Sequence, residues 1–315
     1  MAGNWRVSGI SAQPGETARG LARWPGVGRE VPLVLVNGRE EGPLTVILGG
    51  IHGCEYTSID AAILLSRLLP VLGVRGRVAV VPVVAMEAYA ARSVYVHPLD
   101  RKNLNRSLPG DPGGSETDRL AAQLSRALLN DCDYLIDLHG GDMNEALVPF
   151  ILYPPSPDPD LEGRARDFAT AFGIKYIVRG ETPGSTYSVA AAGGKVAVLA
   201  EAGQQGLLDP AGSDLLVEGT LYALRSARFV PGAVRRAEGR VLVDRFVWTR
   251  CAHFGCWYPA VRVGDVVQAG QKAGAVRDLF GDLLQEIVAD TAGTVLFCVT
   301  SLAINQGDPL FAVGC

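Results

Sequence analysis

Short apolar runs rich in valine and isoleucine alternate with segments of helical periodicity, and this alternation limits the fold more than any other feature of the chain. The apolar runs each end at glycine, proline or a charged residue and occupy residues 44–50, 77–86, 133–140, 149–153, 175–180 and 195–203. Runs of this length are typical of strands buried on both faces of a sheet. The helical patterns occupy residues 58–73, 115–130 and 161–173. The alternation predicts an α/β domain with a mostly parallel sheet flanked by helices.

Two of the helical patterns carry signals for their ends. Ser115 is followed three residues later by Asp118, which predicts a helix that begins with a pair of mutually capping side chains. Gly173 predicts the stop of the following helix, because glycine readily adopts the left-handed conformation found there.

The pattern changes near residues 232–240. Short strand-like pieces with Gly-Asp turns follow, as in "RVGDVVQAGQKAG" and "NQGDPLFAVG". They predict a small all-β domain at residues 234–315, after an α/β domain at residues 1–233. The chain has 315 residues, of which 48% are hydrophobic, so it contains enough apolar material for two cores.

Charge and cysteine content argue against several classes of protein. The net charge is −4 without a run of like charges, which argues against a nucleic-acid or membrane surface. The first residues lack the basic and apolar regions of a signal peptide, and no apolar run reaches the ~18 residues of a membrane helix. Six cysteines are too few for a disulfide framework, so we expect reduced thiols and a cytoplasmic location.

Polar side chains that could hold a metal follow three of the expected strands. His52 and Glu55 come after the strand at 44–50, His139 follows the strand at 133–138, and Glu201 follows the strand at 195–200. Ligands of open α/β sheets bind beyond the carboxyl ends of the strands, so we expect these groups to meet. Two histidines and one carboxylate match the ligand set of a hydrolytic zinc site, which leaves a position for water. Asp137 is expected to orient His139.

Simpler interpretations exist for each of these features. An isolated His-x-x-Glu pair is common and usually binds no metal, and a histidine at a strand end is usually hydrogen-bonded and inert. Cys251, His253 and Cys256 invite a second metal site, but no further pair with ligand spacing follows them, which favours buried thiols.

The segment "HPLDRKNLNRSLPG", residues 97–110, is rich in asparagine, arginine and proline and lacks a regular period. Most such segments are solvated loops. Alternatively, Asn105 and Arg106 clamp a carboxylate of the substrate, for which the guanidinium offers a bidentate fork.

Four motifs in order, "GGIHGCE", "NLNRSLPG", "DLHGG" and "AEAG", resemble the succinylglutamate desuccinylase and aspartoacylase family of zinc carboxypeptidase-like hydrolases. The resemblance covers about residues 40–315. It implies one Zn²⁺ per chain, held by His52, Glu55 and His139. It also implies that Glu201 is the general base toward the attacking water, that Asn105 and Arg106 bind a carboxylate, and that Tyr187 contacts a small N-acyl substrate.

The chain departs from the family pattern at two positions. The arginine that stabilises the oxyanion in the family corresponds to Val94 here, and Arg92, two residues away, is the expected substitute because alternate residues of an extended segment share a face. A further substrate-binding arginine of aspartoacylases corresponds to Ala191, which argues against N-acetylaspartate as the substrate.

The C-terminal segment resembles the barrel-sandwich hybrid of biotinyl and lipoyl carriers through its "GDxVxxGQ" turn. No carrier lysine stands at a hairpin tip, so we expect a lid or spacer beside the substrate entrance.

We therefore expect a zinc amidohydrolase that deacylates a small N-acylated amino acid or related carboxylate. A carboxypeptidase-like peptidase and a non-catalytic protein that binds metal or a small molecule remain as alternatives. Retention of Glu201 favours an enzyme, because a pure binder has little use for a second carboxylate beside the metal. The sequence leaves the identity of the acyl group and the oligomeric state open, a homo-oligomer included.

Overall fold

Strands make up most of the regular structure in residues 3–234 and 239–315, which are the residues that the computed structural model describes. The strands of the first part are β1 (Trp5–Val7), β2 (Ile10–Ala12), β3 (Glu16–Ala22), β4 (Val31–Asn37), β5 (Leu44–Leu48), β6 (Arg77–Val81), β7 (Tyr134–His139), β8 (Glu145–Leu147), β9 (Phe150–Tyr153), β10 (Tyr176–Arg179) and β11 (Val196–Glu201). The later strands are β12 (Val241–Val243), β13 (Phe246–Arg250), β14 (Gly255–Pro259), β15 (Val266–Val267), β16 (Lys272–Arg277), β17 (Leu283–Val288), β18 (Gly293–Val299), β19 (Ala303–Ile304) and β20 (Pro309–Gly314).

The helices lie in the first part of the described chain. They are α1 (Tyr56–Leu68), α2 (Met86–Ala91), α3 (Glu116–Leu124), α4 (Pro159–Phe172), α5 (Thr186–Ala192) and α6 (Pro210–Ser226), with short helical turns η1 (Leu69–Val71), η2 (Leu104–Arg106) and η3 (Ser125–Leu129). No helix among the described residues is both long and apolar enough to cross a membrane.

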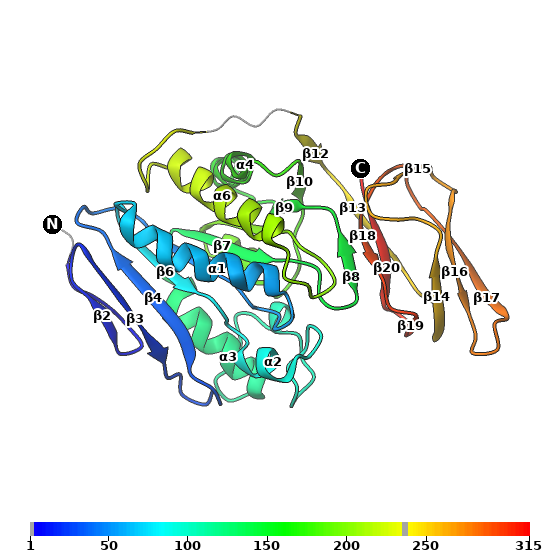
Figure 1. Cartoon of the computed structure of the whole chain (residues 1–315), viewed down its shortest axis with the longest axis horizontal. Coiled ribbons are helices and arrows are strands. Elements are labelled where there is room, and N and C mark those ends of the chain that lie inside the picture. Colours follow the sequence, from blue (N-terminus) through cyan, green and yellow to red (C-terminus); the bar gives the residue numbers. More distant parts are fainter. Residues whose placement is uncertain (1–2, 235–238) are drawn as a thin grey trace.

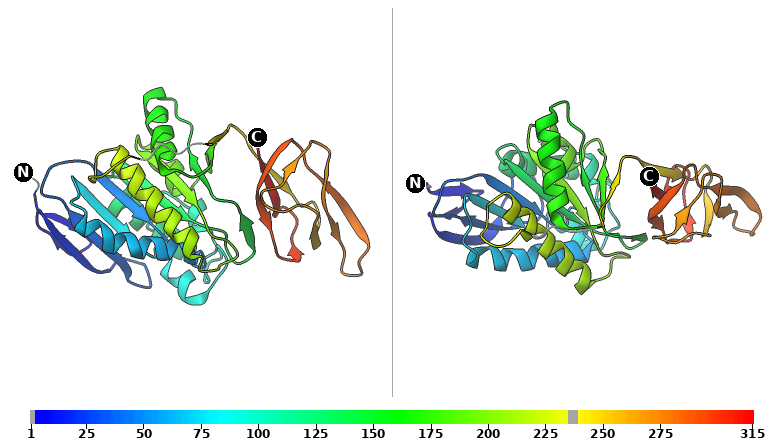
Figure 2. Two further views of the ribbon diagram at one scale, coloured as in Figure 1. Left: turned by 45° about the horizontal axis from the view of Figure 1, so that its top comes forward. Right: turned by 90° about the horizontal axis from the view of Figure 1, so that it is seen from above.

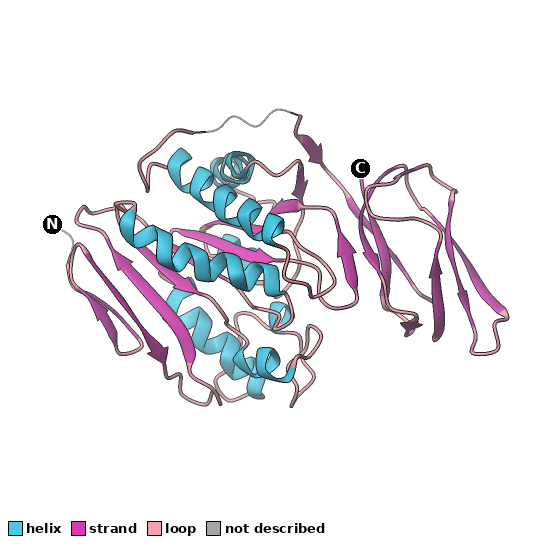
Figure 3. Cartoon of the chain, in the orientation of Figure 1, coloured by secondary structure: helices cyan, strands magenta, loops and turns pink. Residues whose placement is uncertain are grey.

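A nine-stranded sheet forms the centre of the α/β region, with the order β12-β10-β9-β11-β7-β5-β6-β4-β3 (Figures 1 and 3). Its middle strands β11, β7, β5 and β6 run parallel, whereas β3, β4 and β9 pair antiparallel with neighbours. Nearly every residue of the middle strands is buried, as strands covered on both faces require. The predicted α/β fold with a mostly parallel sheet is confirmed.

Helices cover both faces of this sheet and make two apolar cores. On one face α1, α4 and α6 pack with Leu65, Phe172 and Leu216 (Figure 2). On the other face α3 and α5 contribute Leu124 and Tyr187. The sheet is thereby the middle of three layers. The polar residues at the strand ends lie at the two edges of the sheet where its strands begin and end.

The predicted helix ends are present. Ser115 and Asp118 form a capping box at the start of α3, and Gly173 ends α4 with a φ of 87°. The helix expected over 115–130 changes at Ser125 to a π-helical turn, so its regular part is shorter than the sequence pattern predicts.

The C-terminal part contains two small antiparallel sheets, β13-β20-β18-β15 and β17-β16-β14-β19, around a core that includes Trp257 and Phe311 (Figure 2). The predicted all-β character of this region is confirmed. Strand β12 nevertheless belongs to the central sheet, and β8 pairs with β18 of the C-terminal part. The division at residues 233 and 234 stays a prediction, and residues 235–238 within the expected transition lie outside the described residues.

Candidate metal centre and active site

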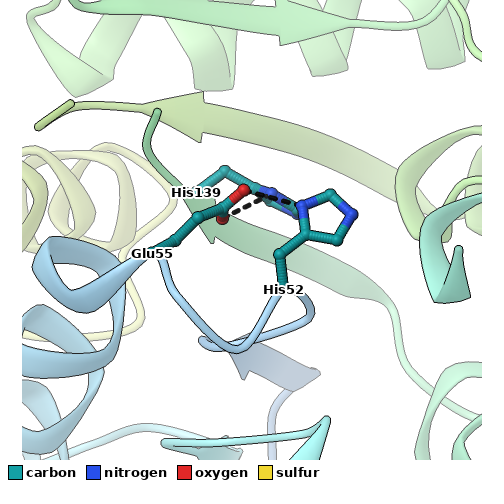
Figure 4. Close-up of side chains that lie close together, drawn as sticks. All are labelled: His52, Glu55 and His139. Atoms are coloured by element: carbon teal, nitrogen blue, oxygen red, sulfur yellow. Dashed lines mark hydrogen bonds and ion pairs between the residues drawn. The ribbon is translucent and has the colours of Figure 1, made fainter. Parts of the chain in front are cut away.

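A tight loop between β5 and α1 carries His52 and Glu55 to the edge of the sheet. Gly50 adopts a φ of 61°, and a Cβ at Gly53 would lie 2.2 Å from the Tyr89 nitrogen. Glycine is therefore required at both positions, one for conformation and one for space. The loop turns immediately after Leu48, the last residue of β5. The side chains of His52 and Glu55 therefore lie beside the end of the neighbouring strand β7 (Figure 4).

His139, the last residue of β7, meets this pair. Its Nδ1 lies 2.9 Å from Glu55 Oε2, and His52 Nδ1 lies 2.6 Å from Glu55 Oε1 (Figure 4). The two imidazole rings stand edge to face with centroids 5.1 Å apart. Potential ligand atoms of the three side chains all lie within 4.8 Å of one another, and no other such group occurs in the described parts of the chain.

The outer nitrogen of each ring is hydrogen-bonded to an oxygen. His139 Nε2 lies 3.0 Å from Asp137 Oδ2, and His52 Nε2 lies 3.0 Å from Asn103 Oδ1. Because a carboxylate or amide oxygen can only accept, each Nε2 donates, which directs the Nδ1 atoms toward Glu55. The expected contact between Asp137 and His139 is present, and Thr186 Oγ1 donates a further bond to Asp137.

The pKa values of Glu55 and His139 are shifted in directions that favour the charged form of each side chain. Burial alone would raise the pKa of Glu55, but the imidazoles of His139 and His52 lower it to about 2. Burial opposes charge on His139, yet Asp137 and Glu55 outweigh it and raise the pKa of His139 well above its usual range. A buried carboxylate that remains ionised between two imidazoles is suited to hold a cation.

Glu201 lies next to the triad on the neighbouring strand. It ends β11, and its Cα is paired in register with that of His139. Burial raises the pKa of Glu201 well above its usual range, His139 opposes this, and Glu55 adds to it. Its Oε2 is buried without a hydrogen-bond partner among the described residues. A carboxyl group in this state can take up and release a proton.

Asn105 and Arg106 lie in η2 but face different surroundings. Asn105 is buried; its Oδ1 accepts a bond from the Thr186 nitrogen at 3.0 Å, and its Nδ2 lies 3.5 Å from His139 Nε2. The side chain of Arg106 reaches solvent and donates to the Asn105 carbonyl at 2.7 Å. Partial desolvation lowers the pKa of Arg106, against the influence of Tyr187, Glu145 and Glu201.

Tyr187 lies in α5, and Arg92 lies at the C-terminal end of α2. Tyr187 is buried in α5, with its hydroxyl 3.4 Å from Thr182 Oγ1. Arg92 is exposed at the end of α2 in a left-handed conformation, and its charge acts on Cys54 and Tyr56, the residues that flank Glu55. In the described part of the chain, no hydrogen bond joins the Arg92 guanidinium to the triad.

The thiol of Cys251 donates to the His253 carbonyl oxygen at 2.8 Å, and neither residue belongs to a group that could hold a metal. Asn103 was missed in the sequence, although it stands two residues before Asn105 in the stretch that was singled out.

The mixed sheet has the α/β architecture that the sequence predicts, and the two histidines and the glutamate beyond the ends of its central parallel strands form a group that could hold one metal ion. The family model of the succinylglutamate desuccinylase/aspartoacylase catalytic domain matches residues 41–227. The chain belongs to the succinylglutamate desuccinylase/aspartoacylase family, and it is thereby a deacylating hydrolase.

Three relatives illustrate this membership. The N-alpha-acetyl-L-2,4-diaminobutyric acid deacetylase of Halomonas elongata is 30% identical over 292 residues, which is 90% of this chain and 85% of the relative. A succinylglutamate desuccinylase/aspartoacylase structure from Rhodobacter sphaeroides has a TM-score of 0.84 at 27% identity, with 94% of both chains covered. The product-bound ectoine utilization protein EutE (DoeB) of Ruegeria pomeroyi has a TM-score of 0.84 at 26% identity, covering 98% of this chain and 99% of that one.

Proposed function

We propose that the protein is a zinc-dependent deacylase that hydrolyses the amide bond of a small N-acylated amino acid. The observation that carries the proposal is the convergence of His52, Glu55 and His139 with ligand atoms within 4.8 Å, beside the unpaired carboxyl oxygen of Glu201. The Halomonas relative, a deacetylase of an N-acetylated amino acid, supports this class of substrate.

The donor set fits a zinc ion. Zinc in hydrolytic sites takes imidazole nitrogen and carboxylate oxygen from three protein ligands and keeps one position open. His52, Glu55 and His139 would hold one ion per chain, and the bonds to Asn103 and Asp137 would fix the ring orientations. When bound, zinc supplies Lewis acidity, which acidifies a water molecule and polarises the acyl carbonyl.

Glu201 acts as the general base and then as the general acid. Its carboxylate accepts a proton from the attacking water and delivers it to the nitrogen of the leaving amine. Burial raises the pKa of Glu201, which makes its carboxylate a stronger base toward the proton of the water molecule. Loss of such a group costs on the order of 10²–10⁴ in rate.

Arg106 binds a carboxylate of the substrate at the mouth of the site, and the buried Asn105 amide lies beside His139 to position the acyl group. Tyr187, whose buried hydroxyl lies 3.4 Å from Thr182 Oγ1, stays our proposal for a further substrate contact. Arg92 remains our proposal for the oxyanion. We also propose a cytoplasmic location, in keeping with six cysteines that are all free.

Metal analysis and amine release test the proposal together. Purified protein is expected to contain a single zinc ion per chain, to lose it in His52→Ala, and to release amine from a panel of N-acetyl amino acids. Glu201→Gln should keep the metal and lose about 10²–10⁴ in kcat. Glu286→Gln, an exposed substitution in the ion pair with Lys272, is the matched control. Absence of zinc after loading, or equal rates for Glu201→Gln and the control, would refute the proposal.

A further inference from the structure

A cavity of about 620 Å³ opens at the edge of the central sheet that is opposite the triad. Helices α1 and α6 run side by side to this edge (Figure 1), where the Arg75 nitrogen donates to the Phe229 carbonyl at 2.8 Å. The end of β4 and the segment before β6 form the other wall, and Asn37 pairs there with Arg77. The triad follows the opposite ends of the parallel strands, so the cavity is separate from the candidate active site. Its volume is in the range of small-molecule sites.

Positive charge predominates in the lining of this cavity. Four arginines line it together with two glutamates, namely Arg39, Arg75, Arg225, Arg228, Glu16 and Glu40. The cavity therefore has a local excess of two positive charges, although the whole chain has a net charge of −4. Within residues 3–234 and 239–315, none of these six side chains takes part in an ion pair. Like charges that are brought together repel one another, and a bound anion would relieve this repulsion.

Arg225 has a buried hydrogen-bond donor that lacks an acceptor. Its Nε is buried and has no hydrogen-bond partner in the part of the chain that the structure describes. Two contacts hold the guanidinium in place: it lies 5.6 Å from the ring centroid of Tyr222, and a Cβ added at Gly232 would lie 2.6 Å from Nε. A buried donor without an acceptor is unfavourable, and it is usual where a ligand or water completes a site.

The C-terminal end of α6 explains only part of this cluster. Cations stabilise the partial negative charge at the end of a helix, and Arg225 lies in the last turn of α6. Its Nε nevertheless donates to no carbonyl of that helix. Arg39 and Arg75 come from other segments, after β4 and before β6. Arg39 lies over Gly15, where an added Cβ would be 2.9 Å from its Cγ, so its side chain is held beside the cavity.

We propose that this cavity binds a small organic anion that carries at least two negative charges as phosphate or carboxylate groups. A guanidinium group binds either of them through two parallel hydrogen bonds. The lining also includes Val36, Val74 and Phe229, each at most 7% exposed, and these side chains can contact the apolar part of such a ligand. Binding here does not depend on the deacylase function proposed above, because none of the triad residues lines the cavity.

Three aromatic anions of similar size test the charge and the chemical group of the ligand. Phenyl phosphate and isophthalate carry two negative charges at mildly alkaline pH, whereas benzoate carries one. In calorimetry with the full-length zinc-loaded protein in phosphate-free buffer, at least one of the two dianions should bind about 10-fold or more tightly than benzoate. Tighter binding of phenyl phosphate would support a phosphate ligand, and tighter binding of isophthalate would support a carboxylate.

Substitutions at the two edges of the sheet locate the bound anion. In Arg225→Gln the dissociation constant of the preferred dianion should rise about 10- to 100-fold, the range of one hydrogen bond to a charged group. Arg228→Gln, at an exposed position, should raise it about 10-fold. Arg106→Gln at the proposed active site should bind the dianion as the wild type does. Arg262→Gln removes an exposed arginine from the C-terminal part and is the matched control.

The melting temperature of each ligand-free variant is recorded, and Arg228→Gln decides the test if Arg225→Gln is unfolded. Absence of binding of both dianions at millimolar concentration would overturn the proposal. Binding of both dianions no tighter than that of benzoate would overturn it as well. So would binding that is lost in Arg106→Gln but unchanged in the folded variants at Arg225 and Arg228, because the anion would then occupy the proposed active site.

Discussion

Replacement of Asp137 by asparagine should weaken metal binding more than loss of the corresponding contact of His52 with Asn103. Asp137 is fully buried and accepts bonds from His139 Nε2 at 3.0 Å and from Thr186 Oγ1. Partners that orient metal-binding histidines typically contribute 10–100-fold in metal affinity, which is about 1.4–2.7 kcal/mol. Hydrogen bonds to an ionised group are about twice as strong as neutral ones. We therefore expect about 100-fold for Asp137→Asn, and about 10-fold for Asn103→Ala at the neutral acceptor of His52.

Competition with a chromophoric zinc chelator at neutral pH measures both dissociation constants. The melting temperature of each metal-free protein is recorded alongside, because partial unfolding would also lower the affinity. Glu286→Gln serves as the control, since its exposed carboxylate lies on β17 in the C-terminal part. If both variants bind zinc as tightly as the control while they remain folded, the bonds to the outer ring nitrogens do not orient the ligands and the reasoning fails.

Three further predictions address stability and catalysis. Ser115 and Thr117 donate to Asp100, and against the effect of desolvation these bonds hold its pKa below the ordinary 3.8, so Asp100→Ala should lower the free energy of unfolding by about 1 kcal/mol at neutral pH. The difference should shrink as the pH falls below 3.8, because the unfolded state then takes up the proton first; urea unfolding at two pH values checks this. Trp257→Ala should cost about 3–5 kcal/mol and unfold the C-terminal sheets, as calorimetry can show, since Trp257 is 2% exposed and donates to the Val299 carbonyl. Arg92→Gln should lower kcat by about 10²–10³ with little change in KM if Arg92 stabilises the oxyanion, and unchanged kinetics would exclude that role.

The central sheet and the triad could be predicted because their signals are local. Runs of valine and isoleucine identify strands such as β5 and β7 without knowledge of the rest of the fold. Parallel neighbours end at one edge, so the residues that follow them meet whatever the loops do elsewhere. Gly50 and Gly53 then permit the tight turn that brings His52 and Glu55 toward His139.

The outer contacts could not be predicted, because they depend on loops whose conformation is set by distant segments. Asn103 reaches His52 across 51 positions of the sequence, and Thr186 reaches Asp137 across 49. Neither residue lies in a periodic segment that would signal its partner. The antiparallel edge formed by β3 and β4 was likewise not recognised, and β12 joins the central sheet beyond the expected domain boundary. In each of these cases the structure depends on contacts between residues that are far apart in the sequence, and the local sequence pattern does not indicate such contacts.

Strand β8 connects the α/β region to the C-terminal part. Its pairing with β18 places Val299 opposite Glu145, so the position of Glu145 depends on both regions. Phe150 in β9 packs against Phe246 in β13 with ring centroids 5.3 Å apart, which fixes the same junction from the adjoining strand. The triad residues, in contrast, lie on β7 and on the loop between β5 and α1, and the side chains that orient the histidines, including Asn103, also belong to the α/β region. Because β8 is the strand that follows β7 in the chain, its pairing with β18 is the contact through which the C-terminal sheets could serve as the lid or spacer expected from the sequence, and that role stays our proposal.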